Sequence, residues 1–368
     1  MRDLKHFAWL VAGCLLAIGF VLATDFSKAP HITLAAGIAA WCADMLIVAI
    51  LSARPGGARL AGFVAGLFMA VPPFTAASNL ARFLLTCGLV LPMLGASELA
   101  LAPPISGVLT RLAYICTCFP GGQARRRERG FDAGALRQLV AATVTLAVAI
   151  AVVKAVPGPF GVWLPVRWFA GGIAMLAFAE IVTAALPLLT ASLGVEVPPL
   201  MHSPCLATSI SEFWGQRWNV QASVLFHRYF FAPLARHGVG LAVFVTFAIS
   251  GLGHAAMADL ALGQWRMTLA FGAFFAVQPF FMAIERWMNV RRWPRMAAHV
   301  WTLCALTITA PLFVEPALRV IEKSWGPPDN VLLPTAAVLG YVMLFCGLVS
   351  LAALKTTAAS TAEVDGSL

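Results

Sequence analysis

Two stretches of this sequence carry side chains suited to chemistry. Residues 209–220, SISEFWGQRWNV, gather charged, amide and tryptophan side chains in a chain that is 60% hydrophobic and only 11% charged. Residues 244–257, FVTFAISGLGHAAM, place His254 inside an apolar run. Polar groups in apolar surroundings are costly unless they meet partners or a substrate. Both stretches are therefore candidate parts of a functional site.

His254 and Asn219 suggest proton transfer at a carbonyl. A neutral imidazole can take a proton from a hydroxyl as its oxygen attacks a carbonyl, and an asparagine amide can orient the reactant or donate to developing negative charge. Ionisable residues at membrane depth commonly mark functional pathways, although a lone histidine can also be a structural hydrogen-bonding group. Gly251 and Gly253 would let a substrate, or another backbone, approach the imidazole closely.

Two common catalytic signatures are missing from the sequence. It has no Gly-x-Ser-x-Gly elbow, so a serine hydrolase lacks its usual support. It also has no glycine-rich phosphate loop ending in Lys-Ser/Thr, which argues against a P-loop ATPase.

The first stretch must be positioned by a helix. Ser209-x-x-Glu212 matches a capping box, which predicts a helix running through Trp218 and beyond. On such a helix Trp214 and Trp218 share a face. The alternative is an amphipathic aromatic helix at the membrane interface, where tryptophan is common. The preceding GVEVPPLMHSP predicts a proline-rich loop.

The composition predicts an all-α, polytopic transmembrane bundle. Mean hydropathy is +0.85, and soluble domains carry about 25% charged residues. Apolar stretches of roughly 20 residues recur along the chain, so we expect one integral membrane domain over residues 1–368, with a disordered tail from about 356. About ten spans are predicted, with an interfacial or re-entrant segment at 97–120. The spans are 6–24, 31–51, 60–77, 80–96, 136–156, 168–193, 238–257, 266–284, 297–314 and 331–353.

The net charge of +9 indicates orientation and not nucleic-acid binding. The arginine clusters at 125–137 and 286–295 lie between apolar spans, as the positive-inside rule predicts for cytoplasmic loops. This places both termini in the cytoplasm and the loop 315–330 outside. A long first apolar run favours a retained helix over a cleaved signal peptide. Heavy alanine and arginine usage points to a bacterial inner membrane.

Other polar groups carry weaker signals. The cysteines lie mostly in apolar stretches and suggest small buried hydrophobes, so we expect neither disulfides nor a metal site. Asp44 and Glu180 fall inside predicted spans. They could line an access route for a substrate or a proton path. They could equally be partners of Arg82 or Arg111, or protonated carboxyls.

The residues quoted above resemble a known family. The segment from Ser209 to Asn219 reads Ser-x-x-Glu-Phe-Trp-Gly-x-Arg-Trp-Asn, and Ser250-Gly-x-x-His254 follows it. Together they resemble the wax synthase-like branch of the membrane-bound O-acyltransferase (MBOAT) family. The close match covers residues 198–257.

The resemblance implies acyl transfer from acyl-CoA, as a co-substrate and without a cofactor, to a hydrophobic alcohol in the membrane. It carries over His254 as the catalytic base and Asn219 as its partner. The chief rival is a transporter of lipids or small molecules, but the sequence shows no paired repeats. The alcohol, the acyl-chain length and the oligomeric state are left open. Candidate substrate-binding residues are Phe213, Trp214, Gln216, Arg217, Trp218, Arg228 and Ser250. The candidate ligands of the CoA phosphates are Arg217, Arg228, Arg291, Arg292 and Arg295.

Overall fold

Long apolar helices dominate the chain, because a helix satisfies its backbone polar groups internally where water is excluded. The computed structural model describes residues 34–53, 57–69, 79–87, 107–117, 125–126, 130–156, 163–192, 195–196 and 198–321, with isolated residues 12, 13, 16 and 99. The elements in chain order are α2 (Leu34–Leu51), α3 (Gly57–Met69), α6 (Val108–Thr117), β1 (Arg125–Arg126), α7 (Ala133–Ala155), α8 (Leu164–Ser192), β2 (Val195–Glu196), η3 (Pro204–Leu206), α9 (Ile210–Glu212), η4 (Phe213–Arg217), α10 (Val220–Phe226), η5 (His227–Phe231), α11 (Ala232–Ala235), α12 (Val239–Leu262), α13 (Trp265–Trp287), η6 (Val290–Arg292) and α14 (Arg295–Ile321).

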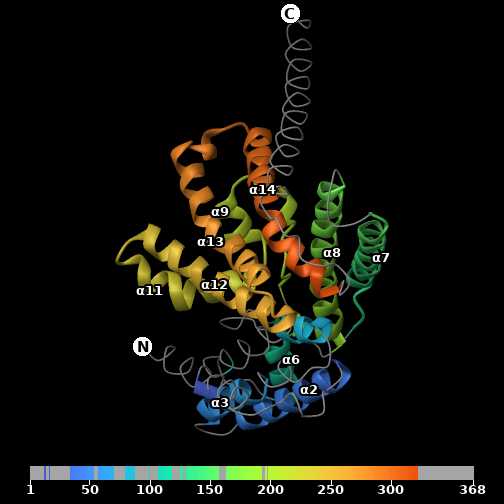
Figure 1. Ribbon diagram of the computed structural model, residues 1–368. Coiled ribbons are helices and arrows are strands. Elements are labelled where there is room, and N and C mark those ends of the chain that lie inside the picture. The colour runs from blue at the N-terminus through green and yellow to red at the C-terminus, as the bar shows by residue number, and fades with distance from the viewer. Residues whose placement is uncertain are drawn as a thin grey trace, which may run out of the picture.

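Five of the described helices, α7, α8, α12, α13 and α14, are long and apolar enough to cross a membrane. This confirms a polytopic helical membrane protein. α7 lies along α8, α12 lies along α13, and α14 packs against α8, α12 and α13 (Figure 1). The two-residue strands β1 and β2 pair antiparallel.

α12 and α13 form a tight helical hairpin. Gly263 ends α12 in the left-handed conformation, with φ +62°, which glycine adopts without steric cost. Only Gln264 separates it from α13, so the two helices must run antiparallel in contact. Their backbones meet at Gly251 and Gly272: a Cβ added to Gly251 would lie 2.8 Å from the Gly272 carbonyl oxygen.

The five predicted spans between residues 136 and 314 are found with shifted ends. The predicted span 297–314 extends to Ile321, so Glu315 does not begin an outward loop. The prediction was wrong there because Glu315 is neutralised inside the bundle. The spans 6–24 and 331–353 lie outside the residues described as continuous helix. α6 is a ten-residue helix within the segment predicted to be interfacial or re-entrant.

The expected absence of disulfides is wrong, because Cys304 is disulfide-bonded; sequence spacing does not report which sulfurs approach in space. Of the two acids inside predicted spans, Asp44 is buried and neither of its oxygens makes a hydrogen bond. Glu180 accepts a hydrogen bond from Gln138 Nε2, which joins α8 to α7.

A buried ionic cluster joins α8 to α14. Glu315 Oε2 lies 3.3 Å from Arg167 Nε, and Glu315 Oε1 lies 3.0 Å from Arg319 Nε. Trp168 Nε1 donates to the same carboxylate at 2.9 Å. Arg167 is fully buried and Arg319 nearly so. One carboxylate therefore offsets two guanidinium charges in the apolar interior.

Replacing Glu315 with Ala should destabilise the bundle strongly, because both arginines would keep their buried charge without this carboxylate. Loss of one partner of a buried pair costs about 3–5 kcal/mol. Thermal unfolding in detergent should show a markedly lower Tm for E315A. E315Q, which keeps the volume and an acceptor for Trp168, should fall between the two. An E315A protein as stable as wild type would contradict this assignment.

Candidate active site

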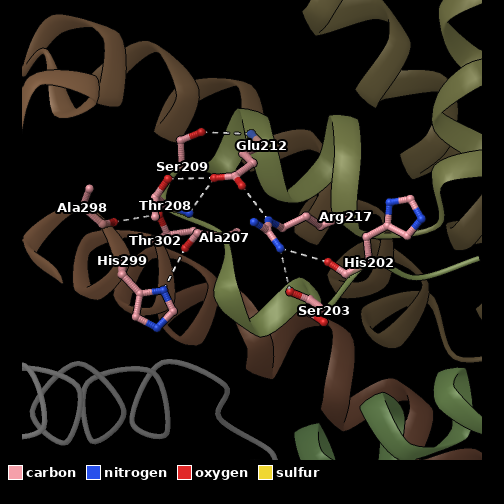
Figure 2. Close-up of polar contacts among 10 residues, drawn as sticks. All are labelled: His202, Ser203, Ala207, Thr208, Ser209, Glu212, Arg217, Ala298, His299 and Thr302. Carbon is pink, nitrogen blue, oxygen red and sulfur yellow. Dashed lines mark hydrogen bonds and ion pairs between the residues drawn. The ribbon is translucent and has the colours of Figure 1, made fainter. Parts of the chain in front are cut away.

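Residues 210–217, formed by α9 and η4, are called the motif helix below. Its start is held by the predicted capping interaction, because Ser209 Oγ accepts the Glu212 amide at 3.0 Å. The Glu212 carboxylate does not close the box on Ser209. Its Oε2 atom instead accepts the amide and hydroxyl of Thr208, at 2.8 and 2.7 Å (Figure 2).

The motif helix ends at Arg217, not beyond Trp218 as predicted. The turn from Phe213 to Arg217 is a π-helix, closed by the Trp218 amide donating to the Phe213 carbonyl at 2.8 Å. Asn219 then adopts a left-handed conformation, with φ +41°, one of the few non-glycine types that does so readily. The chain therefore turns at Asn219 and begins a new helix, α10.

The Arg217 guanidinium donates hydrogen bonds to other groups of the protein. Its Nε donates to Glu212 Oε1 at 2.6 Å, and its Nη1 faces the carbonyl oxygens of His202 and Ser203 at 3.0 and 3.3 Å (Figure 2). These contacts fasten the proline-rich loop to the motif helix. They make Arg217 a structural clamp, and they occupy donors that a substrate phosphate would need.

The buried face of the motif helix is aromatic. Trp214 packs edge-on against Phe247 and Phe274, with ring centroids 5.8 and 5.9 Å apart, and lies 5.5 Å from Phe275. Phe213 stacks on Trp218 at 5.6 Å. Such pairs contribute roughly 0.5–1.5 kcal/mol each beyond area burial. They fix the motif helix against α12 and α13.

Gln278 on α13 supplies the polar counterpart of this packing. It is fully buried, and its Oε1 accepts Trp214 Nε1 at 3.2 Å. Its Nε2 donates to the Phe274 carbonyl at 2.9 Å and to Thr309 Oγ1 at 3.2 Å. Our sequence interpretation missed Gln278, although an uncharged amide in the middle of a predicted span was a usable signal.

His254 lies beside this cluster, partly buried on α12. Its ring stacks on Phe275 at a centroid distance of 3.8 Å and meets Phe271 edge-on at 5.7 Å. Its Nδ1 is 2.8 Å from the Ser250 carbonyl oxygen. A carbonyl oxygen can only accept, so Nδ1 carries the proton. In the neutral ring Nε2 is then an unprotonated base. Ser250 thus orients His254 through its backbone.

Asn219 does not contact His254 as expected. Its Oδ1 accepts the Ala222 amide at 3.2 Å and so caps α10, and its own amide faces Met201 Sδ at 3.2 Å. No hydrogen bond joins the Asn219 and His254 side chains within the region the structure describes. Between them lies a series of ring contacts from Trp218, next to Asn219 in the chain, through Trp214 and Phe275 to His254. This turn was not predicted from the sequence, because the capping box indicated a helix that continues past Trp218.

A pocket of about 510 Å³ opens on the other side of the motif helix. Gln216 is the predicted substrate-binding residue that lines it, together with the cationic side chains Arg291 and Arg295. Arg228 lies on η5 and does not line this pocket. The full lining is Thr208, Ser209, Ser211, Glu212, Gln216, Val290, Arg291, Trp293, Arg295 and Ala298.

Comparisons with known proteins match the same region. Residues 197–277 match the Membrane bound O-acyl transferase family. The chain is 30% identical over 145 residues to "Probable long-chain-alcohol O-fatty-acyltransferase 7" of Arabidopsis thaliana, covering 36% of this chain and 43% of that protein. It is 29% identical over 164 residues to "Acyl-CoA–sterol O-acyltransferase 1" of the same plant, covering 40% and 47%. A "Long-chain-alcohol O-fatty-acyltransferase" of Simmondsia chinensis is 36% identical over 73 residues, covering 17% and 21%.

The described helices are those of a polytopic helical membrane protein, and residues 197–277, which include the motif helix and His254, are similar to the membrane-bound O-acyltransferase family. The similarity extends to proteins named as long-chain-alcohol and sterol O-acyltransferases, in line with the resemblance of the two sequence motifs. The matches span less than half the length of these relatives. The relatives are plant proteins, and the bacterial inner membrane and cytoplasmic termini stay predictions. The roles of the individual site residues are likewise predictions.

Replacing Gly251 with Ala should impair the site, whereas Gly253→Ala should not. The methyl group of an alanine at position 251 would clash with the Gly272 carbonyl oxygen and displace α13, which carries the Phe275 ring stacked on His254. A Cβ added at Gly253 would meet no atom within 4 Å, and alanine has a higher helix propensity than glycine. Tm in detergent should fall for G251A and be unchanged or raised for G253A. Equal behaviour of the two variants would contradict the close helix contact.

Glu212 should stabilise the motif helix in a pH-dependent way. Burial alone would raise the pKa of its carboxyl, but the Thr208 amide and hydroxyl together with Arg217 lower that pKa below its ordinary value of 4.5. A lowered folded-state pKa gives stability that is present above the ordinary value and lost as pH falls through the folded value.

The Tm difference between wild type and E212Q measures this contribution. The difference should be constant well above pH 4.5 and shrink at lower pH. Glu196→Gln, at an exposed acid on β2, serves as the control and should change Tm less. A difference between wild type and E212Q that grows on acidification would overturn the assignment.

Proposed function

We propose that this protein transfers an acyl group from acyl-CoA to the hydroxyl of a hydrophobic alcohol. The main support for this proposal is that the Ser250 carbonyl oxygen lies 2.8 Å from His254 Nδ1. Because Nδ1 then carries the proton, Nε2 of the neutral imidazole is free to act as a base. A base in this form is what deprotonation of an alcohol requires. The family of the matched segment supports the same chemistry.

The proposed reaction needs no covalent acyl-enzyme, because a thioester is already activated. His254 Nε2 takes the hydroxyl proton as the alcohol oxygen bonds to the thioester carbon. The carbonyl oxygen becomes negative, and Asn219 Nδ2 is a candidate donor to it. When the C–S bond breaks, the imidazolium returns its proton to the leaving thiolate. The products are an ester and free CoA.

The pocket beside the motif helix is the proposed position of the CoA head. Arg291 and Arg295 offer positive charge and bidentate hydrogen bonds for phosphates, and Trp293 offers a ring for stacking. The motif helix separates this pocket from the aromatic cluster at His254. The donor would therefore have its polar head on one side of the helix and its thioester near the other.

The acceptor is proposed only as a hydrophobic hydroxyl compound. Relatives are named for long-chain alcohols and for a sterol. A membrane-embedded site would receive either from the lipid phase. The rival function, transport of a lipid or small molecule, requires no ester product and no base.

The deciding experiment offers the purified protein labelled acyl-CoA donors from acetyl to long-chain, with long-chain alcohols and sterols as acceptors. We expect ester formation that depends on His254, with turnover reduced about 10²–10⁴-fold in H254A because the general base is lost. His237→Ala changes an exposed histidine that lies before α12, the helix that carries His254. This variant should keep wild-type turnover.

A panel that yields no His254-dependent ester would reject the acyltransferase. Ester formation that survives in H254A would reject only the role of the base. Comparing size-exclusion profiles of the variants shows that each remains folded.

A further inference from the structure

A buried acid on α13 contacts the first turn of the motif helix. Glu285 is 3% exposed, and its Oε2 accepts the Ile210 amide at 2.6 Å. The Ser211 amide also interacts with this carboxylate. Ile210 begins the motif helix and is itself fully buried. The contact joins residues 75 positions apart in the sequence.

The chemistry of this contact explains why an acid is present. The first amides of a helix have no partner within it, and the helix N-terminus carries partial positive charge. Ser209 satisfies the Glu212 amide, and Glu285 satisfies the amides before it. A charged acceptor makes a shorter and stronger hydrogen bond than a neutral one. The motif helix is thus capped by a side chain from another element.

Glu285 also stands where the two walls of the pocket begin. One wall follows Ile210 and includes Ser211, Glu212 and Gln216. The other follows α13, where Asn289 turns the chain with φ +55° and leads into Val290 and Arg291. Arg291 interacts electrostatically with Glu285, and Val290 is fully buried. One carboxylate therefore connects both walls.

We propose that Glu285 is a positioning residue that fixes the motif helix on α13 and thereby sets the spacing of the pocket walls. The assignment of this pocket to the acyl-CoA donor rests on the proposed function. Glu285 does not line the pocket, so it acts through the groups that do. A second long-range contact lies nearby: His299 Nδ1 is 2.9 Å from the Ala207 carbonyl oxygen (Figure 2). It holds the loop before the motif helix and not the helix itself.

The kinetic test separates donor from acceptor. E285A and E285Q should raise the KM for acyl-CoA, by at least about tenfold in E285A, the equivalent of one lost charge-assisted hydrogen bond. E285Q, which keeps an acceptor oxygen, should lie between E285A and wild type. The acceptor KM should stay unchanged and kcat should change less than the donor KM. Asp259→Asn, at an exposed acid on α12 that contacts Thr268 in the first turn of α13, far along that helix from Glu285, should match wild type.

A second measurement needs no turnover. Hydrogen–deuterium exchange over residues 205–217 should be faster in E285A than in wild type and unchanged in D259N, because the Ile210 amide loses its acceptor. Unchanged exchange, equal increases in both KM values, or a fall in kcat alone would overturn the positioning role. If wild type makes no ester yet E285A shows faster exchange, the proposed function fails while the fixing of the motif helix by Glu285 stands.

Discussion

A polar group inside an apolar bundle has no water to bond with, so another part of the protein must satisfy it. This constraint shapes the site. The indole of Trp214 needs an acceptor and finds Gln278. The amide of Ile210 needs one and finds Glu285. Because both acceptors belong to α13, the hydrogen bonds that these two donors require hold the motif helix against α13.

α13 is consequently the common support of the site. Phe271 and Phe275 contact His254, while Gln278 and Glu285 hold the motif helix. Gln278 and Glu285 are seven residues apart, about two helical turns, and so lie on similar faces of the helix. The close approach of Gly251 to Gly272 brings α12 into register with this support. His254 and the motif helix are thus positioned by α13, a helix to which neither belongs.

Part of the architecture could be predicted from the sequence. The apolar stretches indicated a helical membrane protein, and the spacing Ser209-x-x-Glu212 indicated a helix start; the structure confirms both. The role of His254 as a base stays a prediction. These signals are local, and local spacing survives folding. Asn219 shows the limit: its motif position was recognised, but its left-handed turn and capping role were not, because a helix pattern does not reveal a π-turn that ends it.

Glu285 and Glu315 show why the remainder required the fold. In the sequence each lies at or beyond the end of a predicted span, where charge is expected to meet water. In the structure each is buried against partners distant along the chain, Ile210 for one and Arg167 for the other. The sequence by itself determined the membrane class and the two motifs. Only the tertiary structure decided which acids are buried against distant partners and which helix supports the site, because those contacts join segments whose separation in sequence says nothing of their distance in space.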